Sequence, residues 1–230
     1  MFISATFGFL ALFLLATLAF WPRYISLLGS PIDPYTHLHA AFASLWCLLL
    51  IAQPVLVRRS RPLHRRLGAI SYVIAPCFLV ASVLLAHSRF RAMDEETFMR
   101  EAPSLFLPLS AVALFSVSYI LAIRHRHTMP LHARFMIATG LPMIDPVLGR
   151  LLFFFGPALP HPLHYQLVTF VVTDAVLLAL LLRPRLAPSL RPAFIVPAAL
   201  FPVLHVAWFT IVQRPEWVPF AAWFRRLPLS

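Results

Sequence analysis

The sequence predicts an all-α integral membrane protein, built as a bundle of seven transmembrane helices. Of the 230 residues, 60% are hydrophobic and only 12% are charged, whereas a soluble domain has about 25% charged residues. Apolar stretches of roughly 20 residues, the length that crosses a bilayer, recur along the whole chain. The polar connections between them are short, which leaves no space for a separate soluble domain.

Seven segments have the length and composition of a membrane-spanning helix. They cover residues 2–20, 36–57, 67–87, 103–123, 131–155, 162–182 and 192–213. The first segment differs from a signal peptide because it lacks a basic start and is followed by Trp21-Pro22-Arg23, which is not a small-residue cleavage site. We therefore expect one membrane domain over residues 1–213.

Residues 214–230 are expected to form an aromatic interfacial tail. Aromatic residues recur there at helical spacing and are followed by two arginines, namely Trp217, Phe220, Phe224, Arg225 and Arg226. An apolar face beside basic residues is typical of a helix that lies in the headgroup region. On the same side of the membrane, residues 88–102 form the one substantial polar loop, in which we expect a short helix.

The arginines predict how the chain is oriented in the membrane. The net charge is +11, and eleven arginines lie in three acid-free stretches on one side, at residues 58–66, 124–134 and 183–191. Arginine-rich loops stay in the cytoplasm, so we expect a cytoplasmic N-terminus and an external C-terminus. These arginines should contact the anionic lipid headgroups of the bilayer. Nucleic acid is not an expected partner, because the sequence has no polar stretch long enough to form a binding domain for it.

Ionisable residues inside a membrane are costly and therefore point to functional sites. The direction of each helix places histidines and aspartates of several segments in the outer half of the bundle, where they could face a shared cavity. Imidazole and carboxylate groups in such a pocket are ligands for zinc, copper or iron. We expect a site for a divalent metal ion, serving redox or hydrolytic chemistry, formed by His39, His164, His205 and Asp145. Two histidines could instead be the axial ligands of haem b.

His39 is preferred over His37 as the inward-facing histidine of its helix. Only one of the two can point inward, because positions i and i+2 lie about 200° apart. His39 shares a stripe with Trp46 and Gln53 at successive seven-residue steps, and a stripe with polar members should face protein. The alternative for each of these histidines is a position at headgroup level, with hydrogen bonds and no ligand.

Two aspartates lie inside predicted membrane-spanning segments, where a charged carboxylate is costly. Asp145 lies between Pro142 and Pro146, which should break the helix, as happens where a membrane helix lines a cavity. The alternative is an ion pair with an arginine, either Arg150 or one of another helix. Asp174 lies near mid-membrane with no arginine at its depth, so we expect a protonated carboxyl or a buried histidine partner. We assign Asp174 the catalytic role of proton partner, with a neutral, merely hydrogen-bonded carboxyl as the alternative.

The intramembrane acids also favour a second function class, a proton-coupled transporter or small-ligand receptor. A third class is a non-catalytic assembly or lipid-binding subunit, in which every polar residue has only a structural role. The two cysteines, Cys47 and Cys77, fall at similar depth on neighbouring helices. We interpret them as free apolar residues, with a disulfide or a soft-metal site as the alternatives.

A second layer of histidines lies on the cytoplasmic side. His64 and His132 fall in the first turns of their helices, where the helix dipole disfavours a charged imidazole. Both should be neutral and able to bind a cofactor. If the chemistry is redox, the two layers together would carry electrons across the bilayer.

Three short motifs carry a resemblance to a known group of proteins. They are His37-Leu38-His39 followed by Trp46 and Gln53, then His64-Arg65-Arg66-Leu67-Gly68, and His132-Ala133-Arg134-Phe135-Met136. Over residues 36–180 this pattern resembles uncharacterised bacterial multi-helix membrane proteins that are distantly similar to cytochrome b561-like and domain-of-unknown-function families. The resemblance implies a bacterial inner-membrane location and suggests haem. Its motif histidines are His64, His132 and one of His37 and His39, whereas the metal set chosen above includes His164 and His205.

Overall fold

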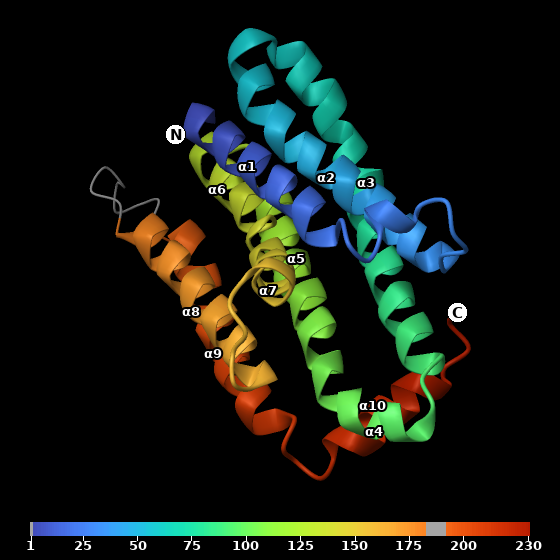
Figure 1. Cartoon of the computed structure of the whole chain (residues 1–230). Helices are drawn as coiled ribbons and strands as arrows, with labels where there is room; N and C mark the ends of the chain where they lie inside the picture. The colour runs from blue at the N-terminus through green and yellow to red at the C-terminus, as the bar shows by residue number, and fades with distance from the viewer. Residues whose placement is uncertain (1, 183–191) are drawn as a thin grey trace.

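The computed structural model describes residues 2–182 and 192–230, and the regular structure in these ranges is entirely helical (Figure 1). The α-helices are α1 (Phe2–Phe20), α2 (Pro34–Arg59), α3 (Arg61–Arg91), α4 (Glu95–Glu101), α5 (Phe106–Arg124), α6 (Met129–Ala138), α7 (Ile144–Phe155), α8 (Pro162–Leu181), α9 (Pro192–Ile211) and α10 (Trp217–Arg226). Short 3-10 helices cover Ile25–Leu27, Ala102–Leu105 and Leu141–Met143. The predicted all-α class is confirmed.

Six helical stretches within the described ranges are long and apolar enough to cross a membrane. They are Pro34–Arg59, Arg61–Arg91, Glu95–Arg124, Met129–Phe155, Leu163–Leu181 and Phe194–Ile211. The first predicted segment forms α1, which packs against α2 and α7, but its apolar stretch Ser4–Phe20 is shorter than the six. The structure thus supports an integral membrane bundle with six candidate spans.

Helices α2 and α3 are longer than the apolar segments that predicted them. Only Ser60 separates the two helices, and its side chain accepts a hydrogen bond from the backbone N–H of Leu63 at 3.4 Å. The basic residues at the end of α2, Arg58 and Arg59, are helical, because a cation is favourable at a helix C-terminus. Most of the expected 58–66 loop is therefore helix rather than loop.

The polar segment 88–102 is also mostly helical. Helix α3 continues to Arg91, and the expected short helix is present as α4. Asp94 caps α4 by accepting hydrogen bonds from the backbone N–H and the hydroxyl of Thr97, at 2.7 and 3.1 Å. These hydrogen bonds hold the pKa of Asp94 below its usual value, because they stabilise its carboxylate form.

The predicted break in the helix that carries Asp145 is confirmed. Helix α6 ends at Ala138, a 3-10 turn covers Leu141–Met143, and α7 begins at Ile144. In Figure 1, α7 is seen almost along its axis, whereas α5 and α8 are seen from the side. The break thus turns the chain out of the direction of its neighbours, and α7 comes to pack between α1 and α8.

Arginine-rich connections gather at one end of the bundle. The start of α1, the α2–α3 turn and the α5–α6 connection lie at the same end in Figure 1, and α4 and α10 lie at the opposite end. This arrangement places residues 58–66 and 124–134 on one side, as their charge predicts. The third stretch, residues 183–191, lies outside the described residues.

The aromatic tail forms α10, which packs across the ends of other helices. Trp217 and Phe224 are buried in a cluster with Phe98, and the Trp217 indole N–H donates to the Ala102 carbonyl at 2.9 Å. Phe220 is 38% exposed, so the face of α10 opposite the cluster points outward. The apolar face of the tail is therefore divided between protein contacts and the surroundings.

Candidate functional site

Three ionisable side chains from three helices meet in the part of the chain that follows the helix break. His205 of α9 lies between Asp145 of α7 and Asp174 of α8. Its Nδ1 is 3.1 Å from Asp174 Oδ2, at hydrogen-bonding geometry. Its Nε2 is 3.4 Å from Asp145 Oδ2, within ion-pair distance. We call these three residues the Asp–His–Asp triad.

The two carboxylates of the triad have different surroundings. Asp145 also accepts a hydrogen bond from the hydroxyl of Thr173, at 2.5 Å. Asp174 has one oxygen on His205, while its buried Oδ1 has no hydrogen-bond partner among the described residues. A buried carboxylate oxygen without a partner is costly, so Asp174 Oδ1 is the triad oxygen that is left for a further donor group.

Aromatic rings hold the imidazole in place. The ring of Phe170 stacks on the ring of His205, with centroids 3.9 Å apart and planes 11° apart. Phe201 meets the same imidazole edge-on, at 5.9 Å. The side chain of His205 is only 8% exposed, whereas that of Asp174 is 33% exposed. The imidazole is thus fixed between apolar walls, and Asp174 forms the open side of the triad.

The geometry allows the triad to bind and release protons. A doubly protonated imidazole has two N–H donors, one for each carboxylate, whereas a neutral imidazole can donate to only one of them. The expected histidine partner of Asp174 is therefore His205. The alternative of an ion pair between Asp145 and an arginine is not observed among the described residues: the partners of Asp145 are His205 and Thr173.

Sequence reasoning missed Phe170 and Thr173 as members of this site. Both precede Asp174 on α8, and both are buried together with Leu177. Spacings of three and four residues place Phe170, Thr173 and Leu177 on one helix face, which is the face that packs against α7 and α9. This periodicity in the sequence indicates that the three residues share a buried helix face. It does not indicate which residues of other helices contact that face.

The other two expected metal ligands lie apart from the triad. His39 of α2 places its Nδ1 3.1 Å from the hydroxyl of Ser82 on α3 and its ring 5.4 Å from that of Phe78. His164 is exposed in the first turn of α8, with its ring 6.2 Å from that of His161. Among residues 2–182 and 192–230, no three His, Cys, Asp or Glu side chains are grouped as metal ligands.

The two histidines expected on the cytoplasmic side, His64 and His132, lie in α3 and α6, which both precede the helix break in the chain. His64 and His132 are close enough to interact electrostatically. His132 directs Nδ1 at the carbonyl of Ala122, at 2.8 Å, so that nitrogen carries the proton and Nε2 is the free acceptor. His64 Nδ1 faces the side-chain amide of Gln53, whose oxygen accepts from the N–H of Gly68 at 3.0 Å when the amide is oriented to satisfy both groups.

The two cysteines do not form a disulfide. Both are free; Cys47 is buried, and its Sγ lies 3.6 Å from Met143 Sδ. A thiol beside a thioether in an apolar core behaves as a small hydrophobic residue. The interpretation of Cys47 and Cys77 as free residues is therefore confirmed.

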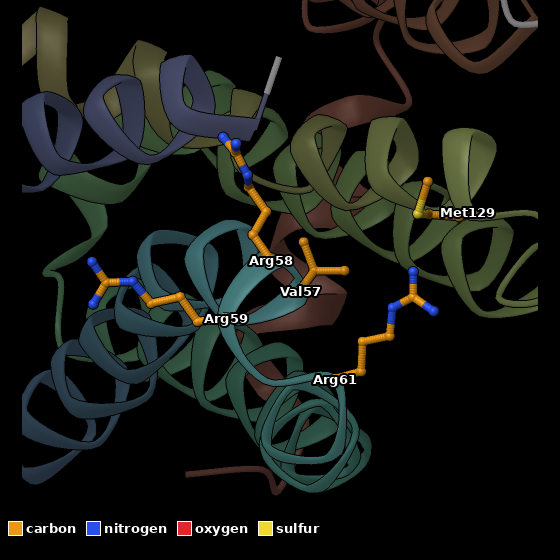
Figure 2. Close-up of a pocket in the computed structure, with 5 residues that line it drawn as sticks. All are labelled: Val57, Arg58, Arg59, Arg61 and Met129. Carbon is orange, nitrogen blue, oxygen red and sulfur yellow. The ribbon is translucent and has the colours of Figure 1, made fainter.

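A hollow of about 440 Å³ lies at the arginine-rich end of the bundle. It is lined by Val57, Arg58, Arg59, Arg61 and Met129. Figure 2 shows that Arg61 extends toward Met129, whereas Arg58 and Arg59 extend in other directions. The hollow thus presents separate cations to its surroundings and not one converging cluster.

No family model, curated protein or solved structure matches the chain.

Proposed function

We propose that the chain is a proton-coupled membrane protein, in which the Asp–His–Asp triad takes up and releases a proton as a small solute binds or passes. The observation that supports this proposal is the position of His205, which faces Asp145 and Asp174 from two other helices. A proton exchanged at this point changes the attraction between α7, α8 and α9. The triad thereby links protonation to the packing of three helices.

The charge of the triad gives the physical reason. With a charged imidazole and two carboxylates it carries one net negative charge, which the interior of a membrane disfavours. One further proton on a carboxylate makes the triad neutral. Asp174 is the expected acceptor because its Oδ1 has no partner in the described part of the chain. Asp145 already accepts from Thr173.

The broken helix supplies the second support. Asp145 lies in the first turn of α7, directly after the 3-10 turn. Broken helices of transporters carry ligand and ion sites at such points. We include α1 as a seventh span because it packs along α2 and α7. Its start lies at the arginine-rich end of the bundle (Figure 1), so the positive-inside rule places the N-terminus in the cytoplasm and the C-terminus outside.

The test is a titration of the triad in the purified protein. Difference infrared spectroscopy of protein in liposomes should show a carboxylic acid band that grows as pH falls. Asp174→Asn should remove that band, and Asp145→Asn should shift it. A pH-sensitive dye inside the liposomes should show proton uptake under an imposed pH gradient, and Asp174→Asn should lower its rate.

The matched control is Glu101→Gln, which neutralises an exposed acid whose partner is Arg100. This variant should leave both the band and the proton uptake unchanged. A band and an uptake that are the same in wild type, Asp174→Asn and Asp145→Asn would contradict the proposal. Melting temperatures of the variants in the same detergent separate loss of folding from loss of protonation.

A second proposal is a metal ion or haem b, and one observation favours it. His132 Nδ1 is held by the Ala122 carbonyl, which leaves Nε2 as the free lone pair, as in metal-bound histidines generally. His64 is the nearby second ligand, and this pair is also the one that the resemblance to cytochrome b561-like proteins implies. The metal set of His39, His164, His205 and Asp145, with Asp174 as proton partner, has less support, because His39 and His164 contact other residues than His205 and Asp145 do.

The cofactor proposal is tested by the absorption spectrum and the metal content of the purified protein. A Soret band, or one metal ion per chain, that His132→Ala abolishes would support it. His125→Ala is the matched control, because this neighbouring histidine stacks on Phe135 and has no role in the proposed site. A chain without either signal would contradict it.

We expect the helices to be surrounded by a lipid bilayer, and we propose that the arginine-lined hollow binds anionic lipid headgroups. Arg58, Arg59 and Arg61 surround the hollow of Figure 2 without a carboxylate among its lining residues. Basic pockets at a cytoplasmic membrane face bind anionic headgroups. We further propose the bacterial inner membrane as the location, on the resemblance alone.

A further inference from the structure

We propose that a pocket between the end of α3, α4 and α10 binds the phosphate group of an anionic membrane lipid. The pocket has a volume of about 270 Å³ and lies at the end of the bundle opposite the arginine-rich end (Figure 1). It is lined by Arg91, Glu95, Phe98, Ala222, Arg225 and Arg226. Three guanidiniums and one carboxylate give this lining a net formal charge of +2, so the pocket attracts anions.

Arg225 is fixed in the wall of the pocket. Its guanidinium lies 4.7 Å from the ring centroid of Phe98. It donates to the Glu95 carboxylate at 3.1 Å and to the Met93 carbonyl at 2.5 Å. A guanidinium has five N–H donors, so these contacts leave donors for a ligand. Because they also hold the side chain in one orientation, little conformational freedom is lost when a ligand binds.

Arg226 is the lining arginine with the most donors to offer. It is exposed, and within residues 2–182 and 192–230 it makes no hydrogen bond or ion pair. Arg91 is also exposed and donates to the backbone carbonyl of Ser230. Arginine binds phosphate oxygens through paired, charge-assisted hydrogen bonds. Arg226 therefore contacts the phosphate, and the charges of Arg91 and Arg225 strengthen the attraction.

Exposed aromatic rings beside the pocket indicate that the phosphate belongs to a lipid. Phe220 and Trp223 of α10 are 38% and 56% exposed, and their ring centroids lie 5.7 Å apart. Steps of three residues make Trp223 the neighbour of both Phe220 and Arg226 on the helix surface. Tryptophan rings at the ends of membrane helices lie at headgroup level. A lipid whose acyl chains contact these rings brings its phosphate to Arg226, whereas a soluble phosphate gains nothing from them.

The size of the pocket agrees with a headgroup. Its volume of about 270 Å³ lies near the lower end of the range of small-molecule pockets, roughly 300–1,000 Å³. The pocket thus accommodates a phosphate and the small group attached to it, while the acyl chains stay outside, against α10.

Glu95 limits the strength of the site. It is the one carboxylate among the lining residues, its side chain is 78% exposed, and it pairs with Arg225. Neutralising Glu95 raises the net formal charge of the lining to +3 and weakens the competition for the Arg225 guanidinium. Loss of this ion pair therefore strengthens the binding of an anion, a gain that a purely structural ion pair does not produce.

The test measures the lipid next to Trp223 in nanodiscs of phosphatidylcholine. Lipids with brominated acyl chains quench a tryptophan that they contact, so a small fraction of brominated phosphatidylglycerol is compared with the same fraction of brominated phosphatidylcholine. The signal of Trp223 is the difference between each protein and the same protein with Trp223→Phe. We expect several-fold stronger quenching by the brominated phosphatidylglycerol.

Four variants form two matched pairs. Arg226→Gln should lower the enrichment of phosphatidylglycerol about fivefold, the factor for one basic residue at a membrane surface. Its control is Arg100→Gln, at an exposed arginine that pairs with Glu101 and does not line the pocket. Glu95→Gln should raise the enrichment. Its control is Glu96→Gln, at an exposed acid in the same first turn of α4 that does not line the pocket. Both controls should behave like wild type.

Equal quenching by the two brominated lipids in wild type would overturn the proposal, as would an enrichment that Arg226→Gln and Glu95→Gln leave unchanged. Inorganic phosphate that abolishes the enrichment, where chloride of the same ionic strength does not, would overturn the assignment to a lipid. A gain of binding in Glu95→Gln is not explained by misfolding. The variants leave the Asp–His–Asp triad intact, so the test is independent of proton exchange there.

Discussion

The imidazole of His205 lies flat on the ring of Phe170, with 3.9 Å between the two centroids. This contact fixes the plane of the imidazole, and with it the directions in which Nδ1 and Nε2 point. Nδ1 points to Asp174, and Nε2, on the other edge of the ring, points to Asp145. An apolar ring thus positions the only histidine that the described part of the chain places between two carboxylates.

Replacing Phe170 by leucine should destabilise the protein and loosen the triad. The change removes an aromatic stack and part of a buried side chain that is 4% exposed, which costs about 1–3 kcal/mol. Thermal unfolding in detergent measures the loss. The control is Phe153→Leu, at a side chain that is 62% exposed. Equal losses for the two variants would contradict the positioning role of Phe170.

Thr139→Val should destabilise the packing of the helix break against α2. The hydroxyl of Thr139 accepts from the Trp46 indole N–H at 3.2 Å and donates to the Met136 carbonyl at 2.6 Å, in a fully buried site. Valine leaves the indole N–H without a partner, at a cost of about 1–3 kcal/mol. Thermal unfolding, followed by tryptophan fluorescence, measures the loss.

Thr210→Val is the control for this change. The hydroxyl of Thr210 is exposed and donates only to carbonyls of its own helix, those of Val206 and Ala207. Its loss should alter the free energy of unfolding by less than about 0.5 kcal/mol. A Thr139→Val variant as stable as Thr210→Val would show that the Trp46 hydrogen bond is dispensable.

Gly140→Ala should disturb the close approach of the helix break to α1 and α2. A Cβ atom at this position would overlap Cε1 of Phe9 and lie 3.1 Å from Cδ1 of Leu50. Overpacking of this kind costs about 1–3 kcal/mol. At Gly29 an added Cβ meets nothing within 4 Å, so Gly29→Ala should unfold at the wild-type temperature. A difference in melting temperature between the two variants is the measurement.

The stability of α4 should fall in acid. Hydrogen bonds from Thr97 depress the pKa of Asp94, so its cap stabilises α4 above the pKa of the unfolded state and is lost as pH falls through the lower, folded-state pKa. The protection factors of the α4 amides, which compare the observed exchange rate with the intrinsic rate at the same pH, should therefore fall below about pH 4. Asp94→Asn retains a capping side chain and should reduce this fall. An unchanged pH profile in the variant would contradict the role of Asp94.

Much of the fold follows from local patterns in the sequence. Apolar stretches of membrane length predict the long helices, and Pro142 and Pro146 predict the break before α7. The ends of α2 and α3 are misjudged, because charged residues such as Arg59 and Arg89 are helical wherever the dipole or a cap supports them. The buried histidine partner of Asp174 is also predictable, since a carboxylate inside a bilayer needs a partner.

Length, hydropathy and loop charge are local properties, and they are enough to predict a helical, membrane-embedded chain that is asymmetric in charge. The contacts of His205 with Asp145 and Asp174, and of His39 with Ser82, depend on how the helices pack. Helix periodicity limits which face a residue occupies, but it does not say which helix packs against that face. That choice is made by side-chain packing between helices distant in sequence, and it brings the three residues of the Asp–His–Asp triad together.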